Sequence, residues 1–271
     1  MRKGNNTTKG LAGKRFAKRI LPFFAPLFLA SLSAPSKTVE AKSALNAVHS
    51  KIEALKNSNF QMSILEMYED LGLEKQGLSL KTFDEAIMGY LNLKNAGLLS
   101  GKPYLSIVDF DRPSTQKRFW LIDLKKRKVL NYTYVTHGKN SGGTIAKQFS
   151  NINDSNMSSL GFYVTEAVYY GKHGLSLKLD GVDEAHNSNA RLRNIVMHGA
   201  DYATEDFIRQ QGYLGRSEGC PALPMGEHKD VIEKIQDRTA LFIHSDKQDY
   251  SSRFLNQQTA MEVFYNNENV I

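Results

Sequence analysis

The spacing of apolar residues changes near Tyr104, and this change restricts the fold more than any other feature of the 271-residue chain. Before it, apolar residues recur at helical spacing over residues 44–55, 62–71 and 82–93. The last of these stretches opens with Thr82-x-x-Glu85, which is typical of a capping box. After it, short alternating runs predict strands over 104–110, 118–124, 129–136, 162–170, 175–179, 193–197 and 240–244. A helix is expected over 204–211, ending at Gly212, and residues 125–128 are expected to form a solvated hairpin turn. The pattern predicts an α+β protein in which a short helical segment precedes a mainly antiparallel β domain.

The first 34 residues have the order of a secretory signal peptide. Seven bases up to Arg19 precede an apolar run from Ile20 to Ala30, and small residues follow it. The run contains Pro22 and Pro26 and is shorter than the roughly 20 residues of a membrane span, although an uncleaved N-terminal anchor stays an alternative. We therefore expect an exported protein of the periplasm or cell envelope, which meets the membrane only through this segment if it is uncleaved. The expected domains are a signal peptide at 1–34, a helical segment at 35–100, a β domain at 101–250 and a C-terminal tail at 251–271.

The formal charge of +7 comes from the N-terminal region. Residues 1–40 hold eight of the 35 Lys and Arg residues and one of the 28 acidic residues, so the remainder of the chain carries 27 bases and 27 acids. Nucleic-acid binding depends on clustered positive charge on the folded domain, and it is disfavoured here. The sequence contains one cysteine, Cys220, which excludes an internal disulfide and a site with several cysteine ligands.

Cys220 lies in Ser217-Glu-Gly-Cys-Pro, whose glycine and proline indicate a tight loop that can orient a side chain. A nucleophilic thiol needs a base or a positive charge nearby to lower its pKa, and an exported protein exposes an unpaired thiol to oxidation. His198 is the best candidate for the base, because it is expected at the end of a predicted strand. The N–H groups of Gly219 and Cys220 could then face a developing oxyanion.

Other interpretations of these residues remain open at this point. A lone cysteine is often a small buried apolar residue, and a lone histidine is often structural. A papain-like arrangement is disfavoured because its cysteine precedes its histidine in the chain. A zinc site formed by Cys220, His198 and Asp201 is disfavoured because the spacing of metal ligands is missing, and no metal or other cofactor is expected.

Several segments together resemble the exported L,D-transpeptidases with a YkuD-type catalytic domain, in the murein L,D-transpeptidase branch. They are residues 137–142, 149–151, 158–163, 171–177, Ile-Val-Met-His-Gly-Ala at 195–200 and Leu-Gly-Arg-Ser-Glu-Gly-Cys-Pro-Ala-Leu-Pro at 214–224. The last two are specific in combination. The resemblance implies a YkuD-like fold, a mechanism without a cofactor and a peptidoglycan stem peptide as the partner.

The resemblance also implies roles for individual residues. Cys220 corresponds to the nucleophile, His198 to its base, Ser217 to the Ser/Thr of the family motif, and Gly219 with Cys220 to the backbone of the oxyanion hole. Weaker candidates for substrate contacts are Gly199, Arg216, His137, His173 and Tyr163. Two positions depart from the family pattern: Glu218 replaces a usual histidine, and Ala222 replaces a usual Arg or Asn. A carboxylate near the thiol would raise the thiol pKa, so we expect Glu218 to face solvent or to pair with Arg216.

The implied activity is transfer of a stem peptide through a Cys220 thioester to an amine acceptor. An L,D-carboxypeptidase or endopeptidase that uses water as the acceptor is the first alternative. A cell-envelope binding protein without catalytic activity is the second. We also expect that residues 41–78 can be removed without loss of acylation. The sequence does not indicate the oligomeric state.

Overall fold

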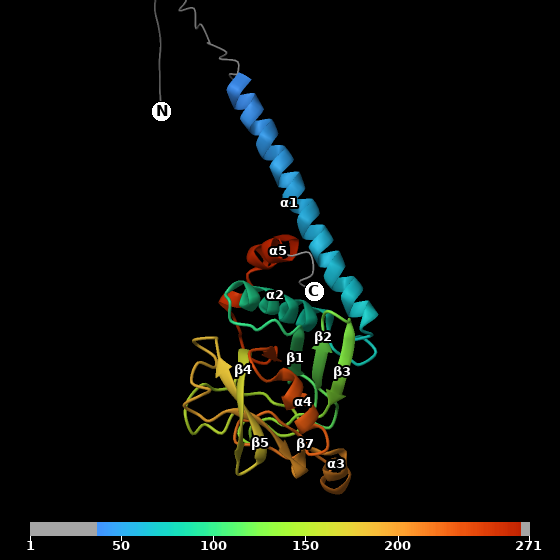
Figure 1. Ribbon diagram of the computed structural model, residues 1–271, viewed down its shortest axis with the longest axis vertical. Coiled ribbons are helices and arrows are strands. Elements are labelled where there is room, and N and C mark those ends of the chain that lie inside the picture. Colours follow the sequence, from blue (N-terminus) through green and yellow to red (C-terminus); the bar gives the residue numbers. More distant parts are fainter. Residues whose placement is uncertain (1–36, 267–271) are drawn as a thin grey trace, which may run out of the picture. The chain divides into compact units, whose positions relative to one another are not determined.

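The computed structural model describes residues 37–266 (Figure 1). The predicted signal peptide, residues 1–34, lies outside the described residues. The chain divides into two units after Val48, within helix α1 (Lys37–Asp70), and every later element belongs to the unit that begins at His49. Among the described helices, none is long and apolar enough to cross a membrane.

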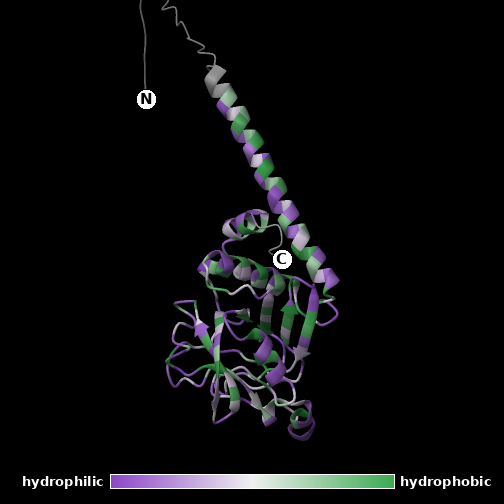
Figure 2. Cartoon of the chain, viewed as in Figure 1, coloured by the Kyte–Doolittle hydropathy of each residue, from purple (hydrophilic) through white to green (hydrophobic). Residues whose placement is uncertain are grey.

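The N-terminal helices differ from the predicted ones in two respects. Residues 44–55 and 62–71 were expected to form two helices, but α1 is continuous, because the residues between them include neither Gly nor Pro. Its apolar and polar residues alternate around the helix (Figure 2). Helix α2 (Leu80–Asn95) begins earlier than predicted: Ser79 is the N-cap, and its side chain accepts the Thr82 N–H at 3.0 Å. The predicted Thr82 capping box is therefore wrong, and Glu85 is available for another contact.

One eight-stranded sheet forms the centre of the larger unit, with the order β3-β2-β1-β8-β4-β5-β6-β7. The β1–β8 and β6–β7 pairs are parallel and the other pairs are antiparallel, which confirms a mainly antiparallel sheet. The predicted turn at 125–128 joins β2 and β3, and the turn residue Arg127 has a φ of 46°. The strands are β1 (Tyr104–Asp109), β2 (Phe119–Asp123), β3 (Lys128–Thr133), β4 (Gly161–Gly171), β5 (Gly174–Gly181), β6 (Val196–Ala200), β7 (Ala222–Pro224) and β8 (Ala240–His244).

Apolar side chains cover both faces of the sheet. Trp120, Phe162 and Phe242 pack in a cluster with residues of α1, α2 and α5 (Gln257–Asn266). Their sequence neighbours Leu121, Tyr163 and Leu241 pack on the opposite face with α4 (His228–Ile235). Helices α1 and α2 therefore share a core with the sheet instead of forming a separate segment.

The predicted C-terminal tail also belongs to this core. It contains the 3₁₀ helix η2 (Arg253–Leu255) and α5, and the buried side chains Phe254, Met261 and Val263 pack with α2. The short helix α3 (Glu205–Gln211) matches its prediction. Thr204 caps its N-terminus, and Gly212 ends it with a φ of 78°.

Candidate active site

Cys220 lies directly before Pro221 and β7, on the loop that approaches strand β6. β7 runs parallel to β6, with His198 opposite Ala222. The half-buried Cys220 thiol donates to the Asn194 carbonyl oxygen at 3.6 Å, and its sulfur accepts the Val196 N–H at 3.4 Å. The thiol therefore lies beside the start of β6, the strand that carries His198.

Ser217 closes the loop around the cysteine. Its buried Oγ donates to the Cys220 carbonyl oxygen at 2.6 Å and accepts the Gly219 N–H at 3.1 Å. Gly219 has a φ of 123°, and a Cβ atom at this position would lie 2.7 Å from the Met157 carbonyl oxygen, so only glycine fits without strain. Because Ser217 already accepts the Gly219 N–H, one of the two N–H groups of the predicted oxyanion hole is engaged within the loop.

Residues 136–139 support the same loop from the other side. The Ser217 N–H donates to the His137 carbonyl at 3.0 Å, and the Lys139 N–H donates to the Ser217 carbonyl at 2.7 Å. The Thr136 hydroxyl donates to the Cys220 carbonyl at 3.4 Å and accepts the Ala222 N–H at 3.1 Å. The sequence placed Thr136 at the end of a predicted strand and gave no signal of this contact.

His198 lies in the middle of β6, although it was expected at the end of a strand, because the strand continues to Ala200. Its imidazole is buried, and Nδ1 lies 2.9 Å from the Gly199 carbonyl oxygen. Since a carbonyl can only accept, Nδ1 carries the proton and Nε2 carries the lone pair. The His173 ring from the β4–β5 turn stacks on this ring with 4.2 Å between centroids. Burial lowers the pKa of His198 to about 4, so the ring is a neutral base at neutral pH.

The thiol has a different electrostatic environment from the predicted one. Burial raises the pKa of Cys220, while the Val196 N–H and the positive charges of Arg193 and Lys172 act in the opposite direction. Among the contacts of the described residues, no hydrogen bond joins Sγ to the His198 ring. The resting pair is therefore a neutral thiol and a neutral imidazole, and the expected lowering of the thiol pKa is absent from this structure.

A sequence model of the L,D-transpeptidase catalytic domain matches residues 74–244, which is more than half of the chain and includes both His198 and Cys220. The chain belongs to the L,D-transpeptidase catalytic domain family. This confirms the resemblance drawn from the sequence. No curated protein matches the chain.

Solved structures of L,D-transpeptidases are similar to the chain at low sequence identity. An L,D-transpeptidase from Mycobacterium smegmatis is 12% identical over 53% of this chain and 59% of that chain, with a TM-score of 0.34. An L,D-transpeptidase from Xylanimonas cellulosilytica is 12% identical over 67% of this chain and 93% of that chain, with a TM-score of 0.30. The match thus spans less than two thirds of the Mycobacterium protein.

Arg193 is a residue of this L,D-transpeptidase domain that sequence reasoning missed. It was expected in a strand but lies before β6, and its half-buried guanidinium holds the segment from Ser150 to Ser159. It donates to the Ser150 carbonyl at 2.6 Å, the Met157 carbonyl at 2.5 Å and the Ser159 hydroxyl at 3.0 Å. Its charge also favours the Cys220 thiolate. The only indication in the sequence was that Arg193 is a basic residue five positions before His198.

Glu218 projects away from the thiol, as predicted, but its partner differs. Its carboxylate is 70% exposed and lies 3.2 Å from the Lys139 ammonium group. Arg216, the predicted partner, donates instead to the Gly142 carbonyl at 3.1 Å. Because Glu218 is paired and solvated, it is a minor influence on the thiol of this L,D-transpeptidase domain.

Three of the weaker candidates for substrate contacts are buried and make contacts within the fold. His137 is buried, accepts from Arg118 Nη2 at 2.8 Å through Nδ1, and has its pKa lowered to about 4 by burial. Tyr163 is buried with its hydroxyl beside Ser159, and burial raises its pKa. A Cβ atom on Gly199 would lie 2.5 Å from His228, so this glycine allows close packing. In this structure none of the three reaches the surface, and His173 is the weaker candidate that joins His198.

A small pocket of about 290 Å³ is lined by residues near the start of β6 in this L,D-transpeptidase domain. Its lining includes Asn194 and Val196, whose backbones contact Sγ, but neither Cys220 nor His198. The other lining residues are Tyr169, Lys178, Arg191 and Ile195. Among the described residues, the geometry for a metal occurs elsewhere, at Asp109, Asp111 and His244, and the exposed Asp201 is not part of it.

Proposed function

We propose that this L,D-transpeptidase domain is a cysteine acyltransferase that acts on peptidoglycan stem peptides. One observation carries the proposal: His198 is neutral, its Nε2 lone pair is defined by the Nδ1 contact with Gly199, and the Cys220 thiol contacts the first residue of the strand that carries His198. This is the chemistry of a nucleophile with an adjacent general base. We propose that the donor stem binds at the pocket that Asn194 and Val196 line.

Acylation begins with attack of Sγ on the carbonyl at the L-centre of a diamino-acid residue. Because both groups are neutral at rest, the thiol proton moves to His198 Nε2 as the C–S bond forms. The Cys220 N–H stabilises the oxyanion of the tetrahedral intermediate. When the amide C–N bond breaks, His198 returns the proton to the departing amine of the terminal D-residue, and a thioester remains on Cys220.

The acceptor determines the product. A side-chain amine of a second stem gives a cross-link between two third-position residues, and this is the outcome that we propose. Water would give a shortened stem, as in an L,D-carboxypeptidase or endopeptidase. The steps use residues of this chain without a metal or an organic cofactor. Because peptidoglycan lies outside the cytoplasmic membrane, we propose export through residues 1–34 and action in the cell envelope.

The experiment is incubation of the mature chain with tetrapeptide-bearing peptidoglycan fragments, followed by mass spectrometry. The wild type should give cross-linked dimers and a thioester adduct on the protein, whereas Cys220→Ala should give neither. His198→Ala should acylate at least about 100-fold more slowly, which is the lower range for a general base. The exposed His49 provides the matched control, and His49→Ala should behave as the wild type does.

Each other outcome has a defined meaning. Tripeptide stems without dimers, dependent on Cys220, would assign the chain to the hydrolases. Identical products from the wild type and Cys220→Ala would contradict catalysis on this donor and support a binding protein.

The acid limb of kcat/KM should lie near pH 4, because His198 is an unprotonated base above that value. An acid limb near 6.5 would contradict the assignment of the base to a buried His198.

A further inference from the structure

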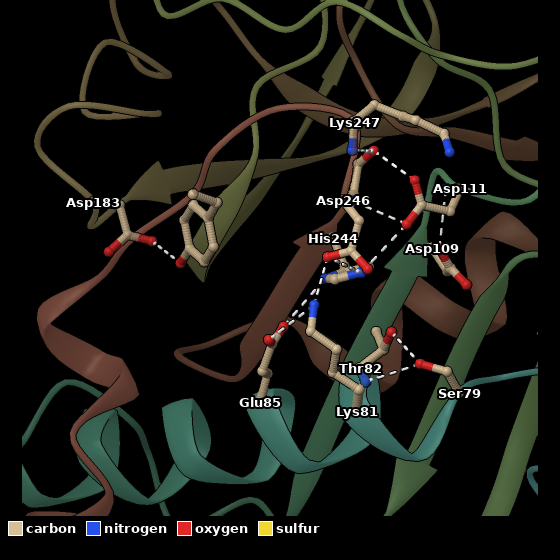
Figure 3. Close-up of polar contacts among 12 residues, drawn as sticks. Ser79, Lys81, Thr82, Glu85, Asp109, Asp111, Asp183, His244, Asp246 and Lys247 are labelled. Carbon is tan, nitrogen blue, oxygen red and sulfur yellow. Dashed lines mark hydrogen bonds and ion pairs between the residues drawn. The ribbon is translucent and has the colours of Figure 1, made fainter.

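A second group of chemically active side chains lies at the ends of strands β1 and β8. Asp109 and His244 are register partners in these parallel strands, and Asp111 follows β1. One ligand atom from each of the three residues lies within 4.8 Å of the others (Figure 3). We call these three residues the β1–β8 cluster. In the sheet order, β4 and β5 separate β8 from β6, so the cluster is distinct from the Cys220 site.

The orientation of His244 is fixed by helix α2. Glu85 Oε2 lies 3.2 Å from His244 Nδ1, on the side of the ring away from Asp111. A carboxylate in this position holds a proton on Nδ1, so Nε2 is the ring nitrogen that can bind another ligand once it is deprotonated. Carboxylate–histidine pairs of this kind orient metal-binding imidazoles in proteins.

The Nε2 side of the ring faces acceptors instead of donors. His244 is 4% exposed, and its Nε2 lies 3.5 Å from Asp111 Oδ2 and 3.6 Å from Asp246 Oδ1. Both distances exceed the roughly 2.7–3.2 Å of an N–H···O hydrogen bond. They are close to the separation of about 3.4 Å between ligands that each lie ~2.1 Å from a tetrahedral metal. The buried nitrogen and the carboxylates therefore have the spacing of ligands around a cation.

The charge at this end of the sheet also favours a cation. Asp109 is 5% exposed, and its buried carboxylate lies beside the half-buried carboxylate of Asp111. The ammonium group of Lys81 contacts Glu85 and Asp246, and the charges of Arg112 and Arg118 act on Asp109. A polar cavity of about 210 Å³ gives access from solvent. It is lined by Lys81, Glu85, His244, Ser245, Asp246, Gln248, Asp249 and Tyr250.

We propose that the β1–β8 cluster binds a divalent transition-metal ion through His244 Nε2 and the carboxylates of Asp109 and Asp111. One imidazole with two carboxylates suits zinc or manganese, and it does not suit a soft ion that prefers thiolates. Glu85 orients the imidazole, and Asp246 stands at the cavity side, where it or water completes the coordination. The ion ties β1, β8 and α2 together and stabilises the fold, and it takes no part in chemistry at Cys220.

The experiment measures zinc binding to the untagged, EDTA-dialysed mature chain by isothermal titration calorimetry. The Cys220→Ala background removes the thiol as a competing ligand. We expect one zinc ion per chain and a thermal midpoint that rises with zinc. Asp111→Asn and His244→Gln should each weaken binding by at least about 100-fold, and Glu85→Gln by about 10-fold to 100-fold. Asp249→Asn is the matched control, since it removes a charge from the same cavity but no proposed ligand.

The outcomes separate this proposal from a set of ion pairs and from the Cys220 site. Cobalt(II) should give a visible absorption band that Asp111→Asn abolishes and Asp249→Asn retains, with all variants folded by circular dichroism. Zinc affinity that is unchanged in both Asp111→Asn and His244→Gln would overturn the proposal, as would absence of stoichiometric binding. Acylation by the EDTA-treated wild type tests the proposed function separately, because it is expected to continue without the metal.

Discussion

Ser217 shows how a single hydroxyl organises the nucleophile loop. It donates to the Cys220 carbonyl and accepts the Gly219 N–H, so it fixes the backbone on both sides of the bond between these two residues. Among the hydrogen bonds of the described residues, none joins it to the thiol or to the His198 ring, and we propose that it positions the nucleophile. A threonine can make the same two hydrogen bonds, because its hydroxyl is also both a donor and an acceptor.

We predict that Ser217→Ala lowers the acylation rate more than it affects folding, while Ser217→Thr restores most of the rate. Loss of two hydrogen bonds from a buried group should cost about 1–3 kcal/mol of unfolding free energy. Acylation is followed by mass spectrometry and stability by urea unfolding, with Ser58→Ala as the exposed serine control. Unchanged acylation in Ser217→Ala would show that the loop keeps its shape without this hydroxyl.

The sequence indicated which residues bear the chemistry better than it indicated their environment. Cys220 and His198 could be chosen because a lone thiol in a Gly-Cys-Pro loop and a histidine in a strand are local features. The burial that raises the thiol pKa and lowers the His198 pKa depends on β5, β7 and the β4–β5 turn, which are distant in sequence. Arg193 and Thr136 were missed for the same reason, since their contacts exist only after the chain folds.

At the scale of elements, strong alternation predicted strands well, whereas β7, α4 and α5 were missed. β7 has only three residues, and prolines lie beside and within it, so its sequence shows no alternation of apolar and polar residues. It forms because the edge of β6 is open for pairing. Helices α4 and α5 have only eight and ten residues, so each gives a short apolar pattern that is easily missed. The registers of β1 and β8, which create the β1–β8 cluster, could not be predicted from periodicity.

Helix α1 is the element whose expected role changes most. Residues 41–78 were expected to be removable, yet Phe60, Ile64 and Met67 of this stretch are at most 1% exposed and pack in the core with Trp120. Loss of one large apolar side chain from a core costs about 2–5 kcal/mol. Since a domain has only about 5–15 kcal/mol of stability, removal of all three would cost about as much as the whole of it.

We therefore predict that a chain beginning at His49 folds and acylates as the full mature chain does, whereas a chain beginning at Ser79 does not fold. The first retains the whole core-forming part of α1, and the second exposes the apolar surface of α2 and the sheet. Circular dichroism and urea unfolding provide the readout, with mass spectrometry for acylation. Cooperative unfolding of the chain from Ser79 at the wild-type urea midpoint would contradict this account of the core.

At the scale of the whole molecule, buried histidines link folding to pH. Burial lowers the pKa of both His137 and His198 to about 4, below the ordinary value of about 6.5 in an unfolded chain. Between these values the unfolded chain binds more protons than the folded one, so the unfolding free energy falls as pH falls. His244 behaves in the opposite way: Glu85 and neighbouring carboxylates outweigh burial and raise its pKa, so its contribution is lost as pH rises above 6.5.

We predict that the unfolding free energy decreases from pH 6.5 to pH 5, and that His137→Gln makes this decrease smaller. Each buried histidine contributes up to about 1.4 kcal/mol per pH unit in this window. The amide oxygen of the introduced glutamine keeps an acceptor for Arg118, which the His137 Nδ1 provides in the wild type. Burial raises the pKa of Asp84 and Asp109, which opposes the trend equally in both proteins, so the difference between them isolates His137.

Urea unfolding at four pH values measures the slopes, with His49→Gln as the exposed control. Equal slopes for His137→Gln and the wild type would mean that His137 takes up its proton in the folded protein at an ordinary pH, contrary to its burial against a guanidinium group.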